Sequence, residues 1–97
     1  MPSYRVAMTI GELVPGVRPE DVLPGASAAA ESFTVLEAAS VGIVGGLPVL
    51  TVRFTADGDE QAARIGEAIV LGTAAFAFIP RVRMTRRVGA RWQTLRA

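Results

Sequence analysis

The sequence of 97 residues contains no cysteine and no histidine. Lysine and asparagine are also absent, so all ten basic residues are arginine. The lack of cysteine excludes a secreted scaffold held by disulfides, and it excludes thiolate chemistry. Without histidine or lysine, nucleophilic catalysis has no ordinary general base, so only aspartate and glutamate remain as carriers of protons.

Long apolar segments are lacking too. The most apolar stretch, residues 68–79, is shorter than the ~20 residues that a membrane-spanning helix needs. The first residues, Met1 to Arg5, have neither the basic start nor the apolar core of a signal peptide. We therefore expect a cytoplasmic protein without a membrane segment.

What the chain does have is enough apolar material for one core. Hydrophobic residues make up 51% of it, which argues against disorder. A single domain usually spans ~50–200 residues, and no repeat or low-complexity linker divides this sequence. Residues 1–97 are thus expected to form one domain, with many of its core positions held by alanine and valine.

Period-two alternation of apolar and polar residues predicts strands at residues 4–10, 47–55 and 79–85. Residues 34–44 are rich in β-branched side chains and read as another strand. Gly45 and Gly46 join two of these segments, and both central residues of a tight hairpin turn need positive φ. Arg86 and Arg87 break the last alternating pattern, and residues 91–95 are a candidate fifth strand.

Two helices are expected between these strands. Pro19 suits the first position of one helix, and Pro24-Gly25 then predicts a single turn followed by a new helix, because an interior proline costs ~3 kcal/mol. The alternative is one kinked helix. In the second helix, Asp57 with Glu60 resembles a capping box, and Gly66 and Gly72 suit close packing on the sheet.

The predicted fold class is α+β. The order of elements, βαββαβ, predicts a ferredoxin-like sandwich with two helices on one face of an antiparallel four-stranded sheet. A C-terminal β-hairpin within residues 88–97 stays an open alternative. A fold shared this widely implies no function.

Motifs for catalysis, cofactors or metals do not emerge. Asp57, Asp59 and Glu60 resemble the start of a calcium loop but lack its later ligands, so helix capping is the favoured interpretation. The glycines at 42, 45 and 46 form no nucleotide fingerprint, since no helix follows them. We assign no catalytic residue, no metal ligand and no cofactor.

One candidate surface remains, because the polar positions of the strands share the sheet face opposite the helices. Nine residues are expected there: Arg5, Ala7, Thr9, Thr51, Arg53, Thr55, Arg81, Arg83 and Thr85. Val41, Ile43 and Val49 are candidates to add apolar area to it. The charges are also segregated, since residues 68–97 carry six arginines and no acid. Such a face is either solvated, buried against a partner, or used to bind an anion.

We expect a non-catalytic, homo-oligomeric interaction or structural protein, most simply a dimer, that associates through this face or its C-terminal segment. The alternative is a module that binds an anionic small molecule or nucleic acid. An enzyme whose pocket is completed by a second subunit is the third option. The candidate contact residues are Arg5, Arg53, Arg81, Arg83, Arg87, Arg91 and Trp92, and the segment from Arg86 to Arg96 is of interest with them.

Overall fold

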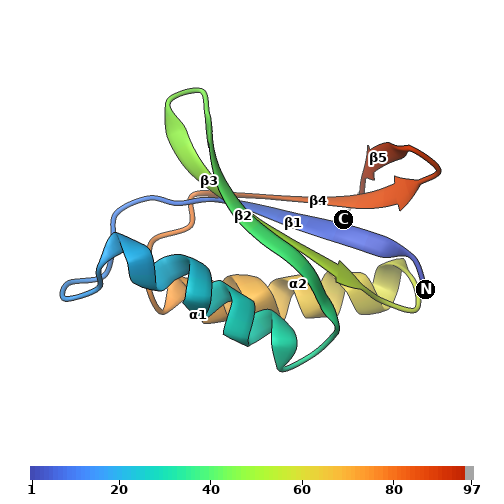
Figure 1. The fold of residues 1–97 in the computed structure, drawn as a ribbon, viewed down its shortest axis with the longest axis horizontal. Helices are drawn as coiled ribbons and strands as arrows, with labels where there is room; N and C mark the ends of the chain where they lie inside the picture. Colours follow the sequence, from blue (N-terminus) through green and yellow to red (C-terminus); the bar gives the residue numbers. More distant parts are fainter. Residues whose placement is uncertain (96–97) are drawn as a thin grey trace.

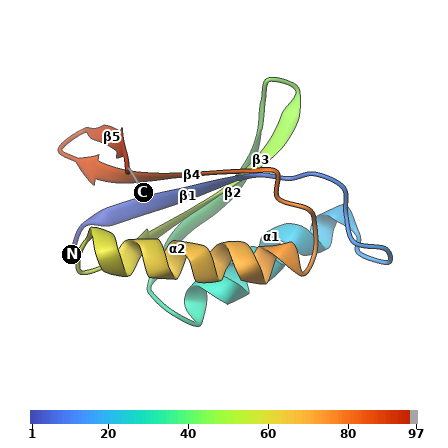
Figure 2. The ribbon, with the colours of Figure 1, turned by 180° about the vertical axis from the view of Figure 1, so that it is seen from behind.

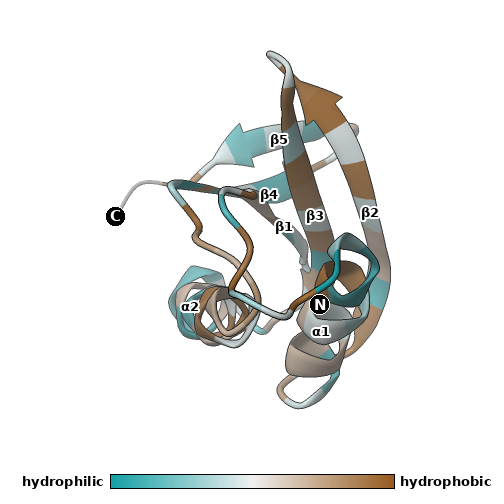
Figure 3. Cartoon of the chain, turned by 90° about the vertical axis from the view of Figure 1, so that its left-hand side faces the viewer, coloured by the Kyte–Doolittle hydropathy of each residue, from teal (hydrophilic) through white to brown (hydrophobic). Residues whose placement is uncertain are grey.

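Seven elements follow one another in the computed structural model, which describes residues 1–95. They are β1 (Ser3–Thr9), α1 (Pro19–Glu31), β2 (Leu36–Val44), β3 (Leu47–Thr55), α2 (Asp59–Ala74), β4 (Arg81–Val88) and β5 (Arg91–Thr94) (Figure 1). The five strands form one antiparallel sheet in the order β2-β3-β1-β4-β5. Both helices lie on the same side of this sheet (Figure 3). The predicted α+β class is confirmed.

The sheet has five strands and not the four expected, and the alternative left open, a C-terminal hairpin with a fifth strand, is confirmed by the antiparallel pairing of β4 with β5. The break predicted at Arg86 and Arg87 is also wrong, since β4 continues through both residues to Val88. Gly89, with a φ of 60°, then lets the chain turn back into β5. Leu95 ends the described part of the hairpin, and Arg96 lies outside the described residues.

The first helix runs without interruption through Pro24, contrary to the favoured prediction of a break. Proline at this position removes one donor, which would have bonded the carbonyl of Glu20 in the first turn. Glu20 is exposed, so water can hydrate this carbonyl. The start of the helix is reinforced by Arg18, whose backbone N–H donates to the Asp21 carboxylate at 3.1 Å.

The second helix begins differently from its prediction. Gly58 is the cap and supplies no side chain, so the expected capping box of Asp57 and Glu60 does not form. Gln61 instead accepts a hydrogen bond from the Asp57 backbone N–H at 2.6 Å. Within the described residues no helix is both long and apolar enough to cross a bilayer.

The core lies between the helices and one face of β1 and β3. Because side chains alternate along a strand, every second residue of these strands points at the helices. Six of these side chains have no exposed area: Tyr4, Val6, Met8, Leu50, Val52 and Phe54. Full burial of one such side chain contributes ~1.5–3 kcal/mol, so these two central strands anchor the fold.

Two glycines of α2 allow close approach, but to different neighbours. A Cβ on Gly72 would lie 2.6 Å from the Cβ of Ala29 in α1, so this glycine brings the two helices together. A Cβ on Gly66 would meet the thioether end of Met84 on β4. The predicted packing on the sheet is therefore right for Gly66 and wrong for Gly72.

We expect Gly72→Ala to lower the free energy of unfolding by about 1 kcal/mol. The gain in helix propensity, ~1 kcal/mol, is outweighed by an overpacking cost of ~1–3 kcal/mol, since neither helix backbone yields easily. Gly66→Ala is the matched control, because the flexible end of Met84 can move away, and it should be neutral or stabilising. Urea denaturation measures both; equal stability of the two variants would contradict the helix contact.

A polar network ties β1, β4 and α2 together at the other end of the sheet. The Tyr4 hydroxyl donates to Asp59 Oδ1 at 2.7 Å, and Arg86 Nη1 lies 2.9 Å from the same oxygen. Burial, followed by the hydrogen bond to Asp59, raises the pKa of Tyr4 to about 12. The hydrogen bond from Tyr4 in turn lowers the pKa of Asp59.

This network predicts an alkaline transition. The neutral phenol of Tyr4 is favoured by the fold, so its stabilisation is complete below the unfolded pKa of 10.0 and is lost as the pH rises toward about 12. Tyr4 is the chain's one tyrosine, so phenolate absorbance reports on it alone. We expect a midpoint near 12 in the folded chain; a midpoint near 10 before unfolding would contradict the buried hydrogen bond.

Candidate anion-binding face

The face of the sheet opposite the helices is hollowed between two hairpins. The hairpin of β2 and β3 and the hairpin of β4 and β5 both rise on this side (Figure 2). The strand register places Arg5 opposite both Arg53 and Thr85, and Ala7 opposite Arg83. Arg5, Arg53 and Arg83, three of the four arginines expected on this face, are therefore grouped around Arg5.

Trp92 of β5 covers part of this face. Its ring centroid lies 3.9 Å from the guanidinium carbon of Arg5 and 5.2 Å from that of Arg53. An arginine in this position is attracted by the ring's quadrupole, with a contribution of ~0.5–1 kcal/mol at an exposed site. The turn at Gly89 makes this contact possible, because it returns the chain over the sheet.

Arg5 and Arg53 are directly opposite each other on neighbouring strands. Like charges in such a pair are destabilising. One carboxylate, that of Glu37, lies close, with its Oε1 3.5 Å from Arg53 Nε. Arg53 Nε is nevertheless buried without a hydrogen-bond partner, while Ser3 Oγ donates to this same Glu37 oxygen at 2.7 Å. The positive charge of the pair is thus only partly offset.

Two adjoining hollows flank Arg5. One, of ≈ 230 Å³, is lined by Arg5, Ala7, Thr51, Arg83, Thr85 and Trp92. The other, of ≈ 330 Å³, is lined by Arg5, Ala38, Ser40, Thr51 and Arg53. Both linings hold guanidinium groups and hydroxyls but no carboxylate, so their chemistry suits an anion.

Arg83 is oriented by β5. Its Nη2 and Nε lie 2.9 and 3.2 Å from Thr94 Oγ1, to which both donate. Among residues 1–95, no carboxylate oxygen lies within 4.0 Å of a guanidinium nitrogen of Arg5 or Arg83. These two arginines therefore keep unused donors at the edge of the hollow.

The other three predicted contact residues line neither of the two hollows beside Arg5. Arg81 is on the same face, beside the tip of the β2–β3 hairpin, where it lines a hollow of ≈ 610 Å³ that shares Ala7, Thr51 and Arg83 with the hollow beneath Trp92. Arg87 Nε donates to the carbonyl of Gly89 at 2.9 Å. Arg91 pairs with Val88, so the alternation along β5 places it on the opposite side from Trp92.

The apolar additions expected on this face are corrected in part. Val41 pairs with Leu50, and Ile43 pairs with Pro48. Val41 and Ile43 therefore lie on the side of the sheet that faces the helices, and not on the open face. Val49 pairs with Thr9 and does belong to the open face.

Sequence reasoning placed Thr51 and Thr85 on the face but did not assign them to a site, and it missed Ser40, Glu37 and Thr94. The alternation of β3 and β4 already indicated the two threonines. Glu37 reaches Arg53 at an irregularity where the register shifts between Leu36 and Ala38, and no sequence signal marks that shift.

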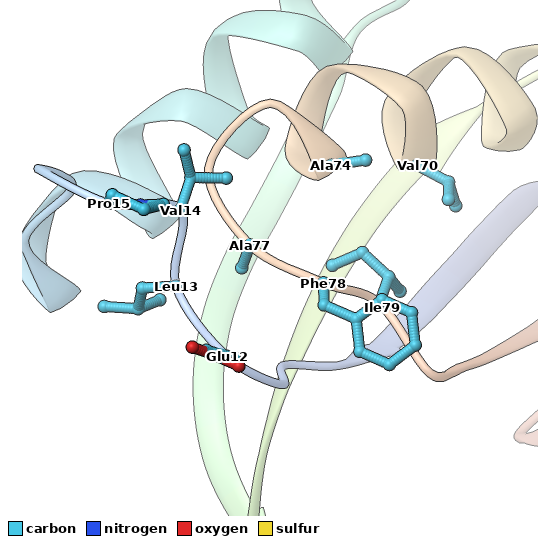
Figure 4. Close-up of a pocket in the computed structure, with 9 residues that line it drawn as sticks. All are labelled: Glu12, Leu13, Val14, Pro15, Val70, Ala74, Ala77, Phe78 and Ile79. Carbon is cyan, nitrogen blue, oxygen red and sulfur yellow. The ribbon is translucent and has the colours of Figure 1, made fainter.

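A further hollow of ≈ 490 Å³ lies where the segment after β1 meets the end of α2 (Figure 4). Its lining is Glu12, Leu13, Val14, Pro15, Val70, Ala74, Ala77, Phe78 and Ile79. Glu12 is the single charged side chain in this lining, so it has no partner there for proton transfer. Among residues 1–95, no three potential metal ligands come together.

Comparison with models of protein families, and with curated proteins, gives no match.

The stacking of Arg5 on Trp92 predicts a measurable coupling. In a double-mutant cycle with Arg5→Gln and Trp92→Leu, we expect a favourable coupling energy of about 0.5–1 kcal/mol from urea denaturation. Arg81→Gln with Trp92→Leu is the control, since no contact joins Arg81 to Trp92, and it should show coupling near zero. Equal coupling in both cycles would rule out the stacking contact.

Proposed function

We propose that this protein is a binding module for a small oxyanion, a phosphate or carboxylate group, held on its open sheet face by Arg5, Arg53 and Arg83. One observation carries the proposal. Arg5 and Arg53 are directly opposite on adjacent strands, where like charges repel; the Trp92 ring lies over both, and Arg83 lines one hollow together with Arg5. An anion between these side chains would remove the repulsion and satisfy their donors.

The hollow beneath Trp92 supplies two kinds of donor for an oxyanion, guanidinium groups and hydroxyl groups. A guanidinium group offers a planar fork of donors that matches the oxygens of phosphate and carboxylate, as lysine does not. Thr51 and Thr85 line the same hollow, and each adds a hydroxyl that can donate. The half-buried ring of Trp92 forms an apolar wall, which lowers the local dielectric constant and strengthens charge-assisted hydrogen bonds.

The stacking of Arg5 on Trp92 favours a small anion over nucleic acid as the ligand. Sheets that bind single-stranded RNA stack bases on exposed aromatic rings. Here Arg5 occupies one face of Trp92, and no other aromatic residue lines the two hollows beside Arg5. The site can neutralise an oxyanion, but it has no free aromatic ring on which a nucleobase could stack.

The residues that line the two hollows beside Arg5 favour a function in binding without catalysis. Neither hollow beside Arg5 contains an aspartate or glutamate in its lining, so proton transfer has no carrier there. A complete enzyme site would need a second subunit to supply one. The cytoplasmic location expected from the sequence stays a prediction.

The fold itself supports a ferredoxin-like classification, which we propose with β5 as an addition. The first six elements follow the order βαββαβ. β1 lies between β3 and β4, and both helices cover one face. This class constrains the architecture and leaves the ligand to be identified by the site.

The hypothesis of self-association through the open sheet face or the C-terminal segment receives less support than anion binding. Trp92, the anchor expected for a partner, contacts Arg5 of its own chain, and Thr94 accepts from Arg83. A dimer stays a prediction, and a different surface is better suited to it.

Fluorescence of Trp92, the chain's one tryptophan, tests the proposal directly. Titration with inorganic phosphate, citrate and a short single-stranded oligonucleotide at low ionic strength should change the emission, because the ligand contacts the arginine stacked on the ring. We expect phosphate or citrate to saturate the signal, and the stronger of the two identifies the preferred oxyanion. Arg83→Gln should weaken binding by about 10-fold, equivalent to ~1.4 kcal/mol.

The matched control is Arg64→Gln, which removes the same charge from α2, where Arg64 pairs with Glu60 at 3.0 Å. It should leave the titration unchanged. The same loss in Arg64→Gln and Arg83→Gln would show that only net charge matters, and it would refute a defined site. Saturation by the oligonucleotide alone would favour nucleic-acid binding.

A further inference from the structure

The two edges of the sheet differ in length and in protection. β5 is the shorter edge, with four residues, and it carries Arg91. β2 forms the other edge with nine residues, and its side chains after Glu37 are all uncharged. Proteins commonly shield an exposed edge strand with charges, proline or shortness. Beyond the irregularity next to Leu36, β2 has none of these, so its backbone donors and acceptors remain open for pairing.

The hairpin turn fixes which backbone groups of β2 point outward. Gly45 and Gly46 have φ values of 59° and 81°, and the register pairs Val44 with Leu47 around them. In such a turn the carbonyl of Val44 bonds the N–H of Leu47, so Val44 points its backbone groups toward β3. Because these groups alternate in direction along an antiparallel strand, Ile43, Val41 and Ala39 point theirs toward the open edge.

The regular part of β2 is symmetric about Val41. It begins at Ala38, after the register shift that follows Leu36, and it ends at Val44, before the turn. Two copies related by a two-fold axis at Val41 would pair their strands over this whole length. Val41 would face Val41 of the second copy, and Ala39 would face Ile43 of the second copy. On either side of the axis, the large side chain of Ile43 would thus lie beside the small side chain of Ala39.

Charge also favours a second copy of the same strand. Residues 38–52 form the longest segment of the chain without a charged residue. Identical charged strands would bring like charges together across a two-fold axis, which is destabilising. This segment avoids that cost, and it offers no charged group to select an acidic or basic peptide. Figure 3 shows the apolar colouring of the β2–β3 hairpin against the polar β4–β5 hairpin.

Apolar area accompanies the open backbone. Val41 and Ile43 are 52% and 70% exposed on the side of the helices. Pairing would bring these side chains against those of the second copy, where their burial adds to the backbone hydrogen bonds.

We infer that the protein forms a two-fold dimer in which β2 pairs antiparallel with β2 of a second copy, with Val41 on the axis, joining the two sheets into one of ten strands. The contact is isologous, so it closes at two copies and leaves no further β2 edge. It uses the backbone edge of β2, and the hollow beneath Trp92 contains no β2 residue, whereas the hollow beside Arg53 includes Ala38 and Ser40 of this strand.

The register can be tested by disulfide formation, because the chain has no native cysteine. Around the proposed axis, position 40 of one copy faces position 42 of the other in a pair without hydrogen bonds, with Cα atoms ~4.5 Å apart. This separation suits a disulfide, which spans ~4.4–6.8 Å. A Cβ on Gly42 meets nothing within 4 Å, so Gly42→Cys fits.

We expect mild oxidation to link Ser40→Cys chains to Gly42→Cys chains when the two are mixed. Each variant alone should link poorly, because its own copies are diagonal neighbours with Cα atoms ~7–8 Å apart. Equal linking in the mixture and in the single variants, or no linking at all, would overturn the proposed register.

Sedimentation velocity over a range of concentrations tests the dimer itself. Val41→Lys places two ammonium groups on the axis, and we expect the dissociation constant of the dimer to rise at least ~10-fold. Val88→Lys is the control, since Val88 on β4 is also exposed, at 44%, and lies far from β2 in the sheet order. A monomer at millimolar concentration, or equal dimerisation of both variants, would overturn the inference.

The outcome is separable from anion binding. Val41 lies on the side of the helices, away from Trp92, so Val41→Lys should leave the phosphate titration of Trp92 unchanged. A monomer that still binds phosphate would refute the dimer alone, and a dimer without phosphate binding would refute the oxyanion site alone.

Discussion

The alternation of side chains on β1 and β3 is the constraint on which the rest of the molecule depends. It places Tyr4, Val6 and Met8 under the helices without exposed area, and it forces Arg5 onto the other face between them. The antiparallel register then sets Arg5 opposite Arg53. A shift by one residue would exchange core and open face, so the burial of the core fixes the position of the arginine pair as firmly as it fixes the fold.

Local patterns predicted most of the elements. The strand at residues 47–55 and the turn at Gly45 and Gly46 were found at their observed positions, because period-two alternation and paired glycines report directly on backbone geometry. Prediction failed where tertiary contacts outweigh local preference. The helix runs through Pro24 because its remaining residues bury Val22, Ala26 and Ala30, and β4 runs through Arg86 because that side chain reaches Asp59.

The candidate site was predicted as a face and not as a cluster. Strand alternation identified Arg5, Arg53 and Arg83 as sharing one side, but their separation depends on the register between neighbouring strands, which the sequence pattern leaves open. The position of Trp92 over Arg5 depends on the turn at Gly89 and on the curl of β5, and both are tertiary outcomes. The arrangement places the like charges of Arg5 and Arg53 side by side beneath the Trp92 ring. Their repulsion lowers the stability of the fold unless an anion is bound between them.

The most direct test of this account is the thermal stability of the chain in phosphate compared with chloride at matched ionic strength. A ligand that binds the folded state alone raises the unfolding temperature according to its concentration and affinity. Phosphate also stabilises proteins generally by exclusion from their surface, so the informative quantity is the difference between the native chain and Arg5→Gln. We expect a larger phosphate-dependent rise in unfolding temperature for the native chain than for Arg5→Gln. The same rise in both would contradict an oxyanion site at the arginine pair.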